Sequence, residues 1–433
     1  MKVHGSSQRG RSSAAVALAL CVAVLTLVGT SSPIARLRAD AQPEMRALWV
    51  LRSSLTSPAS IASLVHTAKE QGFNTLLVQV RGRGDAYYNS TLEPRAADLS
   101  RQPASFDPLA TLLADARASG IRVHAWICVN LVSSAVELPV SPDHLIARHP
   151  EWLMVPRPIA QEVAHLDPVN PGYVGKIARW TRGQLDTVEG LYASPLVPDA
   201  AAYVERVVTD LASRYDVDGV HLDYVRFPNQ QFDYSRFAIQ EFRADLRPRL
   251  SAGARAELDR AEADDLFAYP DRFPAEWKAF RRARLSALVA RVRQALRTAR
   301  PTAVLSAAVA PDAQEAADDR MQDWRGWLSS GLIDAVAPMA YTQEASRFAQ
   351  QIAAARDVAG GRAVWAGIGA YRLSPAQTIE NIQAARRLGT AGFVLFSYDS
   401  LIGTKAPSAD YLSVVSRGAF AANSATPQFP TPK

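Results

Sequence analysis

The segment DAAAYVERVVTDLASRYDVDGVHLDYVRF, residues 199–227, contains the two kinds of element from which most of the chain is built. Residues 199–214 place apolar side chains at helical spacing, with charged residues between them. Residues 219–227 alternate apolar and polar side chains with a period of two, which is typical of a β-strand. The segment therefore predicts a helix followed by a strand, with polar side chains gathered on one face of the strand.

The same alternation of helix and strand continues in both directions from this segment. Eight strands are expected, at residues 46–52, 75–81, 122–130, 219–227, 304–310, 335–341, 364–371 and 392–398. Helices are expected between them, at residues 59–71, 108–119, 199–214, 276–300, 325–330, 346–358 and 375–388. This order predicts the α/β class and a (β/α)₈ TIM barrel. A doubly wound sheet is disfavoured because no GxGxxG motif follows the first strand.

Two connections are much longer than the others. Residues 131–198 follow the third strand and are rich in proline, and residues 229–274 follow the fourth. Loops that follow barrel strands gather at one face and build the active site. We therefore expect a barrel with long insertions after strands 3 and 4, of which residues 131–198 are a candidate substrate wall.

The N-terminus has the pattern of an export signal. Lys2, Arg9 and Arg11 precede an uncharged apolar run at residues 14–30, and residues 39–41 (ADA) offer a cleavage site. The alternative is an uncleaved anchor, although this run is near the lower limit for a membrane span. We expect an exported protein, periplasmic or secreted, without stable membrane insertion after the signal is removed.

The positive charge of the chain comes mostly from its first 41 residues. These carry five basic residues and one acidic residue, so their removal lowers the formal net charge from +6 to +2. So small a charge does not indicate nucleic acid as a partner. Residues 42–420 are expected to form one barrel and residues 421–433 a disordered tail. The sequence does not indicate an oligomeric state.

The polar faces of the central strands should point into the barrel, because the outer face must be apolar to pack against helices. His124, Trp126 and Asn130 share one face of residues 122–130. His221 and Asp223 share one face of residues 219–227. We expect these side chains to meet at the carboxyl end of the barrel.

Asp223 is the leading catalytic candidate. A buried carboxylate is costly unless it is paired, and carboxylates at the carboxyl ends of barrel strands commonly take part in catalysis. The alternative is a structural ion pair with Arg81 or Arg226, or a hydrogen bond to His221, which we expect to orient Asp223. A nearby arginine would keep Asp223 ionised, so that it would act as nucleophile or base.

Glycoside hydrolysis requires a second carboxyl group. Candidates at other strand ends are Asp85, Asp312, Glu344 and Asp399, and each could instead be a turn residue or a helix cap. We prefer Asp312 and Glu344 as catalytic partners, although position alone does not choose among the four.

Aromatic residues at strand ends are equally consistent with a sugar-binding site and with an ordinary barrel core. Trp126, Tyr341 and Tyr398 are candidates for stacking on sugar rings. No HxH or HExxH motif is present, so neither a metal nor another cofactor is expected.

Several of these stretches also resemble the bacterial glycosyl-hydrolase-like 10 family. They are MRALWV (45–50), QVR (79–81) with GDAYY (84–88), HAW (124–126), DGVHLDYVRFP (218–228) and positions within residues 324–341. The resemblance covers residues 45–411 and implies an envelope-associated TIM barrel related to glycosidases. Some family members cleave peptidoglycan strands that have lost their peptides. The matching site positions are Arg81, Asp85, His124, Trp126, His221, Asp223 and Arg226, whereas Met339 replaces a glutamine that is common in the family.

The sequence leaves three hypotheses. The leading one is an exported glycoside hydrolase that acts on a polysaccharide, such as bacterial cell-wall glycan, through carboxyl groups. The second is a glycan-binding barrel of the envelope without catalytic activity. The third is a metal-dependent envelope enzyme that uses Asp85, Asp223 and a histidine.

Overall fold

The computed structural model describes residues 44–420, in which eight parallel strands close into a barrel. The order around the barrel is β1-β10-β9-β8-β7-β6-β3-β2. The fold class expected from the sequence is therefore confirmed. The expected export signal and disordered tail lie outside the described residues.

The barrel strands follow the predicted positions closely. They are β1 (Met45–Val50), β2 (Thr75–Arg81), β3 (Arg122–Cys128), β6 (Gly219–Asp223), β7 (Val304–Val309), β8 (Ala335–Pro338), β9 (Ala363–Ile368) and β10 (Gly392–Leu395). A separate two-stranded antiparallel sheet consists of β4 (Leu131–Ser133) and β5 (Leu191–Tyr192).

Helices cover the outside of the barrel. They are α1 (Pro58–Glu70), α2 (Pro108–Ala118), α6 (Pro198–Arg214), α10 (Pro274–Ala299), α11 (Ala313–Asp319), α12 (Trp324–Ser329), α13 (Ala345–Val358), α14 (Pro375–Arg387) and α15 (Tyr411–Phe420). Ser57 and Ser374 begin α1 and α14 with capping boxes, and a proline follows each of them.

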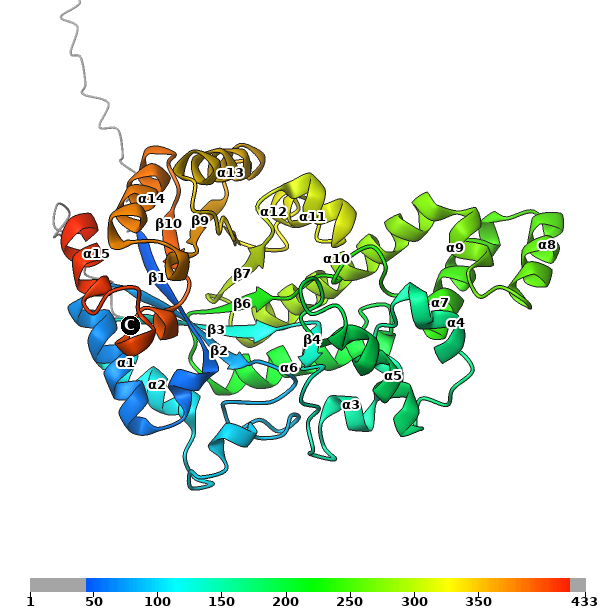
Figure 1. Ribbon diagram of the computed structural model, residues 1–433, viewed down its shortest axis with the longest axis horizontal. Helices are drawn as coiled ribbons and strands as arrows, with labels where there is room; N and C mark the ends of the chain where they lie inside the picture. The colour runs from blue at the N-terminus through cyan, green and yellow to red at the C-terminus, as the bar shows by residue number, and fades with distance from the viewer. Residues whose placement is uncertain (1–43, 421–433) are drawn as a thin grey trace, which may run out of the picture. The chain divides into compact units, whose positions relative to one another are not determined.

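The two insertions contain the remaining helices. The first carries α3 (Leu145–Arg148), α4 (Arg157–Val163) and α5 (Pro171–Arg182), and the second carries α7 (Arg236–Leu246), α8 (Ala252–Glu262) and α9 (Ala268–Arg272). In Figure 1 the arrowheads of β3 and β6 point toward the side on which these insertions lie. The insertions therefore extend the carboxyl end of the barrel, where the candidate residues were expected.

Several strands end earlier than their sequence pattern predicts. The expected strand at residues 219–227 stops at Asp223, because Tyr224 adopts a left-handed conformation with φ of 50°. The alternating pattern continues beyond this point, but the backbone has already turned into the rim of the barrel. Residues 224–227 therefore line the barrel mouth as a loop.

The barrel interior contains a small apolar cluster with polar side chains interspersed. Trp49, Trp126 and Trp365 belong to this cluster and are buried. Trp126 lies beside His221 in the register of β3 and β6, and Cys128 lies beside Asp223. Asp223 is the last residue of β6, so His221 lies two residues deeper in the barrel. Within residues 44–420, none of the helices combines the length and apolarity that crossing a membrane requires.

Candidate active site

A cleft of about 580 Å³ opens at the carboxyl end of the barrel. Its walls come from strands β1, β2, β3, β6, β7, β8 and β10 or from the segments that follow them. The first insertion adds Leu131 and Glu189. Four of the residues predicted from the sequence line this cleft: Trp126, Asp223, Arg226 and Tyr341.

Asp223 lies at the end of β6, where only 9% of its surface is exposed. Its Oδ1 accepts a hydrogen bond from the Tyr224 backbone N–H at 2.7 Å, and its Oδ2 accepts one from Trp126 Nε1 at 3.1 Å. Burial raises the pKa of Asp223 to about 6, although both hydrogen bonds and the charge of Arg226 act in the opposite direction. The carboxyl group is therefore poised to hold a proton under mildly acidic conditions.

Glu189 is a second carboxyl group in the same cleft, and the sequence analysis did not single it out. Its Oε1 accepts a hydrogen bond from Arg226 at 2.6 Å, and its Oε2 accepts one from the Tyr192 hydroxyl at 2.6 Å. Burial raises the pKa of Glu189, but Arg226 and Tyr192 outweigh this effect and hold it below its usual value. At a mildly acidic pH, Glu189 is therefore ionised while Asp223 can hold a proton.

The short β4–β5 sheet positions Glu189 at the cleft. Glu189 and then Gly190 precede β5, and β5 pairs with β4, which follows β3 along the chain. Gly190 passes so close to the Ser133 carbonyl that a Cβ atom would collide with it. The Glu-Gly pair before a short apolar strand was the signal available in the sequence. The insertion around this pair lacks a regular hydrophobic period, so the sequence does not show which way Glu189 points.

Asn130 has a structural position rather than the substrate-binding one expected from the sequence. It is buried, and its Nδ2 donates to the Ala193 carbonyl at 3.0 Å, while its own carbonyl accepts from the Ala193 N–H at 2.7 Å. Asn130 thus fastens the end of β5 to the end of β3. Through this contact it supports the wall that carries Glu189.

Aromatic rings form one side of the cleft. Tyr341 and Phe396 have ring centroids 5.5 Å apart, and Trp126 lies 6.5 Å from Phe396. These rings and the Met339 side chain line the cleft near Asp223. The arrangement can accept the apolar face of a sugar while the carboxyl groups face its oxygens.

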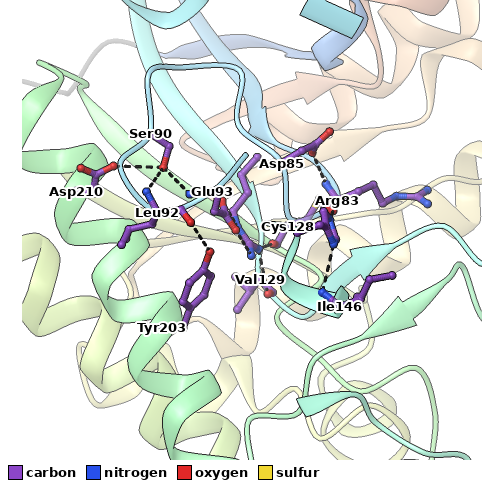
Figure 2. A network of polar contacts seen from close by, with 12 residues as sticks. Arg83, Asp85, Ser90, Leu92, Glu93, Cys128, Val129, Ile146, Tyr203 and Asp210 are labelled. Carbon is purple, nitrogen blue, oxygen red and sulfur yellow. Dashed lines mark hydrogen bonds and ion pairs between the residues drawn. The ribbon is translucent and has the colours of Figure 1, made fainter. Parts of the chain in front are cut away.

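Arg81 lies outside the cleft, in a buried ion pair. Its Nη2 is 2.7 Å from Glu93 Oε1, and its Nε donates to both oxygens of Glu93. Arg81 also donates to the backbone carbonyls of Cys128 and Val129, in the network shown in Figure 2. It therefore connects the loop after β2 to the end of β3 and cannot form the ion pair with Asp223 that was considered from the sequence.

The two barrel histidines lie deeper than Asp223 and contact other groups. Trp49 Nε1 donates to His221 Nε2 at 3.1 Å, so His221 carries its proton on Nδ1, which bonds Ser306 Oγ at 2.9 Å. Burial lowers the pKa of His221 well below its usual value, and burial together with Arg122 lowers that of His124 to about 3. Both rings are neutral, and the expected orienting bond from His221 to Asp223 is replaced by the one from Trp126.

Neither of the two preferred partners lies in the cleft with Asp223. Asp312 caps α11, where it accepts from the backbone N–H groups of Gln314 and Glu315 at 2.9 and 2.8 Å. Glu344 lines an adjoining hollow of about 480 Å³, which shares Met339 and Tyr341 with the cleft. A helix cap was the alternative for both positions, and for Asp312 it is the correct one.

Asp85 and Tyr398 also differ from expectation. The Asp85 carboxylate accepts from the Arg83 backbone N–H at 2.9 Å and thereby shapes the turn after β2. Tyr398 is buried and contacts Ser63 and Thr67 of α1, because β10 ends at Leu395 and a 3₁₀ turn at Tyr398–Ser400 redirects the chain. Phe396 takes the position in the cleft instead.

Metal-binding side chains do not gather anywhere in the described part of the chain. No group of three His, Cys, Asp or Glu residues in positions 44–420 is arranged to hold a metal ion. The set of Asp85, Asp223 and a histidine considered from the sequence does not come together, because Asp85 serves the turn and both barrel histidines lie below the cleft.

The sequence matches a family of known proteins. The family described as Glycosyl hydrolase-like 10 matches residues 44–381, most of the chain. The chain belongs to this family. The member described here is 23% identical to glycosyl hydrolase YngK of Bacillus subtilis over 356 residues, which cover 73% of this chain and 58% of YngK. It is 24% identical to glycosyl hydrolase DigH of Escherichia coli K12 over 371 residues, which cover 76% of this chain and 73% of DigH.

Solved structures show the same fold for this family member. The glycoside hydrolase domain of PgaB (BpsB) from Bordetella bronchiseptica superposes with a TM-score of 0.56 at 17% identity, covering 82% of this chain and 95% of the domain. An α-L-fucosidase from Paenibacillus thiaminolyticus gives a TM-score of 0.56 at 15% identity, covering 88% of this chain and 49% of the other. The chain thus has the same TIM-barrel fold as these two glycoside hydrolases.

Proposed function

We propose that this protein is an exported glycoside hydrolase in which Asp223 donates a proton and Glu189 acts as the catalytic carboxylate. The observation that carries the proposal is the pair of carboxyl groups in one cleft with oppositely displaced pKa values. Two carboxyl groups whose surroundings separate their pKa values are the chemical requirement for cleaving a glycosidic bond.

The reaction follows from the protonation states of the two groups. Protonated Asp223 transfers its proton to the glycosidic oxygen as the bond from that oxygen to the anomeric carbon breaks. The Glu189 carboxylate then either bonds to the anomeric carbon or takes a proton from the water that attacks it. Arg226 and Tyr192 keep Glu189 ionised and fix its position, and Trp126 holds Asp223 through its indole N–H.

The competing function is a glycan-binding barrel without catalytic activity. This alternative predicts a single carboxyl group isolated in the cleft. It gains some support from Glu189, because each of its oxygens already accepts a hydrogen bond, as a purely structural carboxylate would. The lowered pKa of Glu189 and its place in the wall beside Asp223 favour catalysis.

We further propose a bacterial cell-wall glycan as substrate and a location outside the cytoplasm. The motifs at residues 79–88 and 218–228 support the substrate, since they resemble those of a family with members that act on peptide-free peptidoglycan. The basic and apolar N-terminal pattern supports export. N-terminal sequencing of the protein recovered from outside the cytoplasm should begin at Gln42, whereas an intact Met1 on that protein would contradict cleavage.

The proposed activity can be tested on defined glycans. Purified protein is incubated with peptide-free peptidoglycan strands and with chitin oligosaccharides, and the products are identified by mass spectrometry. We expect cleavage by the wild type and a loss of at least about 1,000-fold in kcat for Glu189→Gln, because the amide cannot act as nucleophile or base. Glu315→Gln, which changes an exposed carboxylate of the same cleft, is the matched control and should retain activity. Wild-type kcat in Glu189→Gln would rule out its role.

A further inference from the structure

The cleft has an excess of positive side chains that the overall composition does not explain. Three carboxyl groups line it, together with five arginines, Arg52, Arg83, Arg226, Arg320 and Arg347. The chain after residue 41 has a formal charge of only +2. A site for a neutral sugar chain needs two carboxyl groups and hydrogen-bonding groups, but it does not need a surplus of guanidinium groups.

Arg52 is fixed in the cleft without a counter-ion. It follows β1 and is half-buried, and its Nη1 donates to the neutral side-chain oxygen of Gln79 at 3.2 Å. Its guanidinium also occupies the space that a side chain at Gly82 would need, so the glycine is what allows this position. Among residues 44–420, Arg52 forms no ion pair with a carboxylate, whereas Arg226 is paired with Glu189.

Arg83 lies on the same wall, and its backbone is fixed while its side chain is free. Its N–H donates to Asp85, and its carbonyl bonds His144 Nε2 at 2.7 Å. Figure 2 shows the Arg83 side chain extending away from this network. No residue in the described range 44–420 gives its guanidinium a polar partner, and Arg83, which is half-buried as a whole residue, lines the cleft wall.

We propose that Arg52 and Arg83 form a subsite for a carboxylate carried by the glycan substrate. This inference rests on the proposed function, since it names the substrate class of the same cleft. Guanidinium groups bind carboxylates through paired, charge-assisted hydrogen bonds, and within residues 44–420 neither of these two arginines is paired with a carboxylate. The substrate is therefore an acidic polysaccharide, whose carboxylate belongs either to a uronic acid ring or to an ether substituent on an amino sugar.

The position of the subsite places this carboxylate beside the reacting bond and not at it. Arg52 follows β1 and Arg83 follows β2, whereas Asp223 ends β6, and β3 lies between β2 and β6 in the barrel. The separation keeps the arginines from pairing with Asp223, whose charge would otherwise be stabilised and whose pKa would be lowered. The acidic sugar thus occupies a neighbouring subsite and sets specificity.

The inference can be tested by binding measurements with the full-length Asp223→Asn protein, which is expected not to turn over substrate. The probes are peptide-free peptidoglycan strands, the same strands with their carboxylates converted to neutral methylamides, and oligogalacturonates. We expect the first probe, the third or both to bind at least about tenfold more tightly than the neutral strands at low salt. The tighter-binding of the two acidic probes identifies the source of the carboxylate.

Variants localise the effect. Arg83→Gln should weaken binding of the preferred acidic probe by about tenfold and leave binding of the neutral strands unchanged. Its fold should persist because the side chain makes no polar contact, and Arg52→Lys provides a second test that keeps the charge but loses the paired geometry. Arg101→Gln removes an exposed arginine outside the cleft and should have no effect.

Equal affinity for acidic and neutral strands, or an unchanged affinity in Arg83→Gln, would overturn the carboxylate subsite. The failure of this inference differs from failure of the proposed function. If the wild type cleaves neutral chitin oligosaccharides as fast as acidic strands, the hydrolase assignment stands and the subsite is wrong. If the wild type cleaves no glycan but the acidic probe still binds through Arg83, the subsite stands and the hydrolase assignment is wrong.

Discussion

At the scale of single residues, burial decides the chemistry of Asp223. Two N–H donors and the charge of Arg226 favour its ionised form, yet burial of the carboxyl group still raises its pKa to about 6. Glu189 has the opposite balance, because Arg226 contacts it directly. Burial of Asp223 and the direct pairing of Arg226 with Glu189 thus together separate the proton affinities of the two carboxyl groups.

The pH dependence of turnover should reflect this separation. We expect kcat/KM to fall as the pH rises above about 6, because Asp223 loses the proton that it must donate. It should also fall in strong acid, below the usual pKa of a glutamate, where Glu189 becomes protonated. The profile is measured with a soluble glycan between pH 3 and 9. A rate that is constant from pH 5 to 8 would contradict proton donation by Asp223.

The same pKa also affects stability. Because folding raises the pKa of Asp223 from 3.8 to about 6, its stabilising contribution is fully present below about pH 4 and is lost as the pH rises through 6. From pH 4 to pH 7, wild type should therefore lose about 2.4 kcal/mol of unfolding free energy relative to Asp223→Asn. Urea unfolding of both proteins at each pH measures this difference. A parallel pH dependence of the two proteins would show that Asp223 is not perturbed.

The sequence led to Asp223 but not to Glu189, for a physical reason. Asp223 belongs to a strand, where the period of two reveals which side chains enter the barrel. Glu189 belongs to an irregular segment whose position depends on contacts such as Gly190 with Ser133. Such contacts between distant segments leave no periodic signal, so the sequence identified the wall but not the carboxylate on it.

At the scale of elements, the loop after β2 depends on a buried ion pair. Arg81 and Glu93 are both buried, and Arg81 also holds the backbone after β3. Glu93→Gln leaves the guanidinium buried without a charge partner and should lower the unfolding free energy by about 3 kcal/mol. Glu257→Gln, at an exposed position of α8, should change it by less than about 0.5 kcal/mol. Similar urea midpoints for the two variants would contradict a structural role of the pair.

The barrel strands and the longer helices around them were predictable, whereas their ends, β4, β5 and most helices of the two insertions were not. Strands and helices carry the two periods clearly, as in β6 and α6. The predicted ends of several strands lie too far along the chain. In β6, for example, the alternation of apolar and polar residues continues past Tyr224, although the backbone has left the strand at that residue. Tyr398 illustrates the consequence. Its place at the end of the expected strand predicted a position in the cleft, whereas a 3₁₀ turn directs its side chain toward α1.

At the scale of the whole molecule, the barrel closes where its first and last strands meet. β1 pairs with β10, and Met45 lies beside Gly392 in their register. A Cβ atom at Gly392 would collide with backbone atoms of Met45. Gly392→Ala should therefore force the two strands apart and lower the unfolding free energy by about 3 kcal/mol.

A second glycine provides the control for this prediction. Gly253 lies in α8 with open space around its Cα, so Gly253→Ala should stabilise the protein by about 0.5 kcal/mol. Thermal or urea unfolding of both variants shows whether the loss of stability is specific to the contact between β1 and β10 or occurs wherever a glycine gains a side chain. Equal stability of Gly392→Ala and wild type would mean that β1 and β10 can move apart there without loss of stability, which would contradict this prediction.

Family membership and fold are established for the molecule as a whole, whereas hydrolysis depends on two carboxyl groups within it. The most direct test compares wild type with Asp223→Asn on the same glycan, measuring both cleavage by mass spectrometry and binding by calorimetry. We expect Asp223→Asn to bind the glycan with similar affinity and to lose at least about 1,000-fold in kcat, because a nearly isosteric amide cannot donate the proton. Cleavage by Asp223→Asn at the wild-type rate would contradict the assignment.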